Sequence, residues 1–85
     1  MPKPRSKPPA KDKVQALFGA AVRARREQLL LTQEQLAELA ELHTNYVSSV
    51  ERGERNIGLH NIARLAHALD VPVSKLTLAL DVRSH

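Results

Sequence analysis

The segment that most constrains how this chain can fold is HTNYVSSVERGERN, residues 43–56, which has the length of one short helix and very few apolar residues. Its two aliphatic residues, Val47 and Val50, lie three positions apart and therefore share one face of a helix. Gly53 follows, at a position where a left-handed residue commonly ends a helix. A chain of 85 residues buries little surface, so a polar helix adds little to its core. We therefore expect the polar face of this helix to contact something other than water.

A second short helix is predicted directly before the first, at residues 33–40. Thr32 is a suitable N-cap, and Glu34 lies in the first turn, where a carboxylate interacts favourably with the helix dipole. Residues 41–43 break the pattern, and the following helix is expected at residues 44–52. Two short helices joined by three or four residues form a helix-turn-helix unit, here at about residues 33–52. The residues predicted to pack between its helices are Ala37, Ala40, Leu42, Val47 and Val50.

Three further helices are predicted from apolar residues at helical spacing, which makes the expected fold all-α with five helices. They lie at residues 14–28 and 59–69 and in a short segment that is capped by Ser74 and ends near Leu80. Residues 76–82 also alternate apolar and other residues with period two, which is typical of a strand. Because all the other predicted elements are helices, a helix is favoured for this segment as well.

Composition excludes several classes of site. The chain has no cysteine, and so neither a disulfide nor a thiolate metal site. His60 and His67 are seven residues apart, about 10 Å along a helix, which is too far to share one metal ion. The longest apolar runs are too short to span a bilayer, and no catalytic or nucleotide-binding motif is found. We expect a cytoplasmic protein with no enzymatic activity, metal, cofactor or small-molecule ligand.

The net charge of +4 lies entirely in residues 1–13, which are also rich in proline, whereas the rest of the chain is neutral. These residues are predicted to form a disordered basic arm before a single domain at residues 14–82. The arm either contacts DNA phosphates or only aids solubility. The neutral domain argues against a nonspecific DNA binder that relies on charge alone.

Short polar side chains on the helix at residues 44–52 suit the major groove of DNA. If the two valines of this helix face inward, its outer face is predicted to contain Thr44, Asn45 and Ser49. Asn can pair with an adenine edge through two hydrogen bonds, and Ser and Thr can bond to bases or phosphates. Backbone N–H groups at the start of both short helices can bind phosphates.

Residues 23–76, and above all the pattern TQEQLA followed by YVSSVERG, resemble the Xre/Cro family of phage repressors and small bacterial regulators. The resemblance implies a compact five-helix domain that binds double-stranded operator DNA as a homodimer. In size and layout the chain is similar to restriction–modification controller proteins. The alternatives are a phage-type repressor, an antitoxin whose main task is to bind a toxin partner, and a nonspecific DNA binder.

The resemblance also implies roles for individual residues. Gln33, the first position of the motif, would contact a phosphate or a base while bracing the recognition helix. Arg26 and Glu51 would form a structural ion pair. The other implied DNA contacts come from the recognition helix, the residue before it and the loop after it, and they are His43, Thr44, Asn45, Tyr46, Ser49, Arg52, Arg55 and Asn56.

Three positions depart from the family pattern. Glu41 stands where the turn usually has Gly, and a Glu with positive φ would be strained by about 1–2 kcal/mol, so another turn geometry is the alternative. His43 stands where a Ser or Thr cap is common, and it either caps the helix or contacts DNA. Thr44 and Asn45 stand where many relatives have a base-reading Arg.

Two further surfaces are predicted. Residues 69–82 hold more large apolar side chains than a short helix can bury, which indicates a two-fold homodimer interface. Its predicted residues are Leu69, Leu78 and Val82, whereas the residues expected to face the core are Val73, Leu76 and Leu80. An acidic face of the helix at residues 33–40 points away from DNA and either contacts RNA polymerase or is simply solvated; it comprises Glu34, Glu38 and Glu41.

Overall fold

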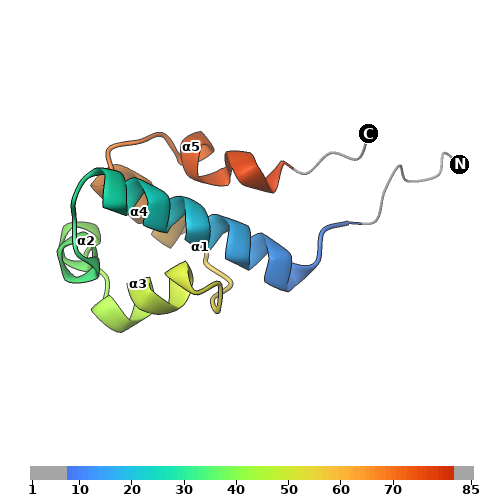
Figure 1. Cartoon of the computed structure of the whole chain (residues 1–85), viewed down its shortest axis with the longest axis horizontal. Helices are drawn as coiled ribbons and strands as arrows, with labels where there is room; N and C mark the ends of the chain where they lie inside the picture. Colours follow the sequence, from blue (N-terminus) through green and yellow to red (C-terminus); the bar gives the residue numbers. More distant parts are fainter. Residues whose placement is uncertain (1–7, 82–85) are drawn as a thin grey trace, which may run out of the picture.

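The computed structural model describes residues 8–81, and within them it contains five α-helices, one 3₁₀ turn and no strand (Figure 1). The elements in chain order are α1 (Lys11–Gln28), α2 (Gln33–Ala40), α3 (Thr44–Glu51), α4 (Leu59–Ala68), α5 (Val73–Thr77) and the 3₁₀ turn η1 (Leu78–Leu80). Helices α3 and α5 lie on opposite sides of α1, and α4 contacts both α2 and α5. The predicted five-helix, all-α fold is confirmed, and residues 76–80 are helical rather than extended. No helix among these residues is long and apolar enough to cross a membrane.

Each of the five helices contributes at least one fully buried aliphatic side chain to a single core. Val22, Leu36, Val47, Leu65 and Leu76 come from α1 to α5 in turn, and each is at most 1% exposed. Burial of such a side chain stabilises a fold by about 1.5–3 kcal/mol. The two short polar helices are thus held by their neighbours rather than by their own helix propensity.

The crossing of α2 and α3 is built as the sequence predicts. Ala37 and Ala40 of α2 and Val47 and Val50 of α3 are buried, and Leu42 in the turn is half-buried against them. Alanine at the crossing leaves the two helix backbones room to approach, while the valines fill the space between them. The polar residues of α3 are consequently turned toward the other side of the helix.

The end of α3 lies directly against α1 at Gly19, which the sequence analysis did not single out. A Cβ atom at Gly19 would lie 2.2 Å from the carbonyl oxygen of Val50 and 2.9 Å from that of Glu51. Only glycine therefore allows the two helices to approach this closely. The contact also brings Glu51 to the surface of α1.

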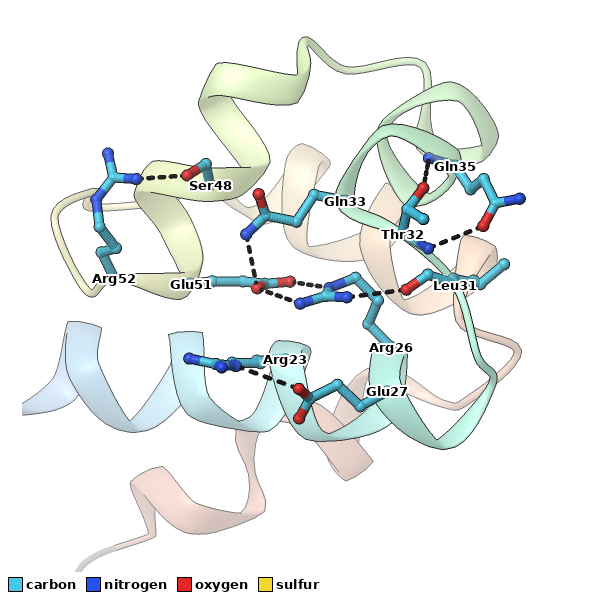
Figure 2. Close-up of polar contacts among 10 residues, drawn as sticks. All are labelled: Arg23, Arg26, Glu27, Leu31, Thr32, Gln33, Gln35, Ser48, Glu51 and Arg52. Atoms are coloured by element: carbon cyan, nitrogen blue, oxygen red, sulfur yellow. Dashed lines mark hydrogen bonds and ion pairs between the residues drawn. The ribbon is translucent and has the colours of Figure 1, made fainter.

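The helix ends follow the predicted signals in part. Thr32 caps α2 in a capping box, in which its hydroxyl accepts from Gln35 N at 3.0 Å and the Gln35 side chain accepts from Thr32 N at 2.8 Å (Figure 2). Gly53 has φ of +76°, as expected after α3. Glu41 does adopt a left-handed conformation, with φ of +58°, so the alternative turn geometry is not used.

Three end assignments need correction. The side chain of His43 makes no capping hydrogen bond, although the residue occupies the N-cap position of α3. Pro72, not Ser74, is the N-cap residue of α5, because the helix already begins at Val73. Helix α1 begins at Lys11, so residues 11–13 are helical rather than part of a disordered arm. Of the rest of the predicted arm, residues 8–10 have no regular secondary structure, and residues 1–7 lie outside the described residues.

The predicted dimer residues do not share one environment. Leu69 is 0% exposed and belongs to the core, because it continues the inward stripe of α4 one turn beyond Leu65. Leu78 is 68% exposed, as predicted, and Val82 lies outside the described residues. The expected core residues Leu76 and Leu80 are buried and half-buried, but Val73 is exposed at the start of α5.

Candidate nucleic-acid interface

A buried ion pair joins the helix-turn-helix unit to α1 (Figure 2). Arg26 donates from Nε to Glu51 Oε2 at 2.6 Å and from Nη2 to Oε1 at 3.0 Å, so the contact is bidentate. The Arg26 side chain is 13% exposed and the Glu51 side chain 3%. The hydrogen bond to Glu51 raises the pKa of Arg26, and Arg26 Nη1 also donates to the Leu31 carbonyl at 2.8 Å. The structural ion pair implied by the resemblance is present.

Gln33 completes this buried cluster from the first turn of α2. Its side-chain amide donates to Glu51 Oε1 at 3.0 Å, and the residue is half-buried (Figure 2). The amide thus links the start of α2 to the end of α3, which is the bracing role that the resemblance implies. We call Arg26, Gln33 and Glu51 the hub, because together they connect α1, α2 and α3.

The first turn of α3 presents its polar side chains to solvent. Asn45 and the preceding His43 are exposed, and Thr44 is half-buried. Thr44 lines an open depression of about 430 Å³ between the starts of α2 and α3, together with Arg26, Thr32, Gln33 and Glu34. Backbone N–H groups at the starts of two helices thus lie beside short polar side chains.

Ser49 does not lie on the outer face on which it was predicted. It is 6% exposed, and its hydroxyl donates to the Tyr46 carbonyl at 2.8 Å. The same hydroxyl accepts from Arg55 Nε at 3.0 Å. The loop after α3 folds back over this position, and helical spacing alone does not reveal where a loop will fold.

Arg52, predicted to contact phosphate, is held by an acidic neighbour and by the last turns of α3. Its Nε donates to Glu54 Oε2 at 3.0 Å and its Nη2 to Glu54 Oε1 at 3.1 Å. Its Nη1 donates to the Ser48 hydroxyl (Figure 2). The Arg52 hydrogen bond lowers the pKa of Glu54, and the same contact raises the pKa of Arg52. Sequence reasoning did not assign Ser48, although it lies four residues before Arg52.

Arg55 and Tyr46 form the second polar cluster beside α3. The Arg55 guanidinium lies 5.3 Å from the centre of the Tyr46 ring. Asn61 of α4 donates from Nδ2 to the Tyr46 hydroxyl at 3.2 Å, and Asn56 in the loop is exposed. Sequence reasoning missed Asn61, because it lies on a different helix, fifteen residues away, and only the tertiary fold brings it to this tyrosine.

The candidate interface therefore combines neutral hydrogen-bonding groups with fixed cations. Asn45 and Thr44 offer donors and acceptors suited to base edges, while Arg52 and Arg55 offer guanidinium groups suited to phosphates. Glu34, Glu38 and Glu41 are all exposed on α2 and in the following turn, but Glu34 lines the depression beside Thr44 and so lies at the candidate interface.

Comparison with known proteins agrees with this geometry. The family model described as helix-turn-helix matches residues 22–76. The control protein C.SmaI of Serratia marcescens is 44% identical over 63 residues, covering 74% of this chain and 75% of that protein. The control protein C.BamHI of Bacillus amyloliquefaciens is 42% identical over 59 residues, covering 68% and 73%. This chain belongs to the helix-turn-helix family, with the control proteins among its relatives.

A solved structure supports the same family assignment. The crystal structure of the restriction–modification controller protein C.AhdI from Aeromonas hydrophila superposes with a TM-score of 0.72 and 45% identity. The similarity covers 73% of this chain and 94% of that one. The predicted resemblance is confirmed, and the family match contains the hub, α2, α3 and the loop that carries Arg52 and Arg55.

Proposed function

We propose that this control-protein relative is a sequence-specific transcription regulator, not an enzyme, that binds a two-fold symmetric DNA operator as a homodimer. The observation that carries the proposal is the exposed, polar first turn of α3, held in place by the buried hub. A recognition helix must present its side chains in a fixed orientation to distinguish base edges. The bidentate Arg26–Glu51 pair and the Gln33 hydrogen bond provide that rigidity.

In this proposal Asn45 and Thr44 read bases, while the surrounding residues bind the DNA backbone. Arg52, Arg55, Asn56 and the Tyr46 hydroxyl are the proposed phosphate contacts, with His43 beside the first turn. Gln33 is half-buried, so its amide can contact DNA at the edge of the interface while it hydrogen-bonds to Glu51. The basic residues of the amino-terminal segment would add affinity that falls as salt concentration rises.

Dimerisation is proposed through the carboxy-terminal segment. Leu78 in η1 is largely exposed and Val73 at the start of α5 is exposed too, so this segment presents apolar side chains that a dimer interface would cover. A two-fold dimer would place two recognition helices about 34 Å apart, one turn of DNA. The exposed acidic face of α2 is the proposed contact for RNA polymerase, and the cytoplasm is the proposed location.

The direct test is selection of bound sites from random double-stranded DNA with purified full-length protein. Enrichment of a two-fold symmetric motif would establish a dimeric, sequence-specific regulator and would reveal its operator. Binding without an enriched motif would contradict the proposal and would indicate a nonspecific DNA binder. A protein that binds no duplex at all would indicate a partner-directed role, such as that of an antitoxin.

A further inference from the structure

The loop after α3 places one arginine under unusual restraint. Arg55 is exposed, yet its Nε donates to the hydroxyl of the buried Ser49 at 3.0 Å, and its guanidinium stacks 5.3 Å from the Tyr46 ring centre. Both partners lie on α3, three residues apart, so one face of the recognition helix holds the arginine at two points. An exposed loop arginine without such contacts would sample many rotamers.

The two side chains that hold Arg55, Tyr46 and Ser49, are themselves restrained by hydrogen bonds, one of which comes from a second helix. The Tyr46 hydroxyl accepts from Asn61 Nδ2 of α4 at 3.2 Å, and the Ser49 hydroxyl donates to the Tyr46 carbonyl at 2.8 Å. Ser49 therefore uses its donor on the backbone of α3 and keeps its acceptor for Arg55, which fixes the direction of this hydrogen bond. Because Tyr46 accepts from Asn61, its own O–H remains able to donate toward a phosphate.

No carboxylate among the described residues forms an ion pair with Arg55, although the charge of Arg55 helps to lower the pKa of the nearby Glu54. Within residues 8–81, Arg26 and Arg52 are paired with glutamates, whereas Arg55 forms no ion pair and its Nη atoms donate to none of these residues. The two Nη groups of a guanidinium can together bind a phosphate or the edge of a guanine. An arginine with its Nε satisfied and its Nη groups unused is prepared for such a contact.

We propose that Ser49 is a positioning residue that, with Tyr46 and Asn61, orients Arg55 for contact with DNA. This role rests on the proposed DNA-binding function, and it replaces the direct DNA contact first predicted for Ser49. Because Ser49 already restrains the Arg55 side chain in the free protein, Arg55 loses less conformational entropy when it binds DNA. Its hydroxyl, not its size, performs this role.

The test is a double-mutant cycle on affinity for the selected operator, with Ser49→Ala, Arg55→Ala and the double variant. Ser49→Ala is expected to weaken binding about 3- to 10-fold, as for loss of one hydrogen bond, and to have no effect when Arg55 is already alanine. Arg55→Ala should also reduce the slope of log affinity against log salt concentration by about one, because one fewer phosphate is neutralised. Ser49→Ala should leave this slope unchanged. Arg23→Ala removes an exposed arginine from α1 and is the matched control for charge.

A second measurement separates positioning from a general effect on folding. In the free wild-type protein, the Arg55 Nε–H resonance should exchange slowly with water, and Ser49→Ala should accelerate that exchange while backbone resonances elsewhere stay unchanged. Equal losses of affinity from Ser49→Ala in both backgrounds would overturn the proposal. Operator binding unaffected by Arg55→Ala would overturn it while leaving the proposed function intact. Failure of the wild type to bind any duplex would overturn both.

Discussion

At the residue scale, the polar side chains around α3 divide into those that hold the helix and those that it presents. Arg26, Gln33 and Glu51 form the hub and are partly or largely buried. Asn45 is exposed and makes no hydrogen bond with its side chain to another described residue. The burial of a side chain thus indicates whether substitution should affect folding or DNA recognition.

Substitution of Asn45 should therefore change recognition and not stability. Asn45→Ala removes the proposed hydrogen bonds to a base and should reduce discrimination between operator and random DNA roughly 5- to 150-fold. Asn56→Ala, a matched change in the exposed loop, should instead weaken binding to all sequences alike. Competition binding measures both ratios, and a uniform loss for Asn45→Ala would identify it as a phosphate contact.

The hub predicts a large effect on stability from a change of one atom. Glu51→Gln leaves the Arg26 charge buried without its carboxylate and should lower the free energy of unfolding by about 3–5 kcal/mol. Glu27→Gln breaks the exposed Arg23–Glu27 pair and should cost less than about 1 kcal/mol. Urea denaturation of both variants is the measurement. Similar stability of Glu51→Gln and the wild type would show that the pair is not a structural element.

Glu54 is expected to oppose DNA binding, because its carboxylate occupies Arg52 and repels phosphates. Arg52 lowers the pKa of Glu54, so the group is charged near neutral pH. Glu54→Gln should strengthen binding to operator and random DNA about 2- to 5-fold, the size expected for an exposed ion pair. Glu38→Gln makes the same charge change on the acidic face of α2. An equal gain from both variants would attribute the effect to net charge alone.

At the scale of elements, several connections contain strained residues instead of glycine. Leu30, Glu41 and Asp70, which follow α1, α2 and α4, have φ of +59°, +58° and +55°. Positive φ costs a residue with a Cβ roughly 1–2 kcal/mol, less for Asp, which tolerates it better. The surrounding helix packing maintains these conformations. The turns therefore depend on tertiary structure more than on local preference.

Replacement of Glu41 by glycine should stabilise the protein. Glu41→Gly removes the strain at the end of α2 and should raise the free energy of unfolding by about 1 kcal/mol, after allowance for the added freedom of the unfolded chain. Glu38→Gly, within the right-handed part of α2, should instead lower it by about 1 kcal/mol. Thermal unfolding of the two variants checks the opposite signs. A lower free energy of unfolding for Glu41→Gly would show that the Glu41 side chain stabilises the protein.

At the scale of the whole molecule, the small core requires every helix. Each helix supplies a fully buried side chain, and Gly19 allows α1 and α3 to approach closely. The helix-turn-helix unit alone would lose most of these contacts. Four leucines of the described residues nonetheless stay exposed, Leu30, Leu39, Leu59 and Leu78, and among them only Leu78 lies in the segment proposed to dimerise.

The proposed dimer can be tested at this leucine. Leu78→Asp should convert a dimer to a monomer at micromolar concentrations, because a carboxylate would be buried in an apolar interface. Leu30→Asp changes another exposed leucine, at a left-handed position that aspartate tolerates, and should leave the dimer intact. Sedimentation equilibrium distinguishes the outcomes. A monomeric wild type would contradict dimerisation through this segment.

The sequence by itself determined the number and order of the helices and the residues between α2 and α3. These features depend on the spacing of apolar residues and on local signals such as Thr32 and Gly53, which act within a few residues. The Arg26–Glu51 pair was also predictable, but from the resemblance to a family and not from spacing.

Only the tertiary structure decided which faces are covered. Ser49 and Leu69 were assigned to surfaces and are buried, because a loop folds over one and the core encloses the other. Asn61 meets Tyr46 across fifteen residues, and Gly19 meets α3 across more than thirty. Such contacts depend on how helices pack in three dimensions, and no periodicity along the chain encodes that packing directly.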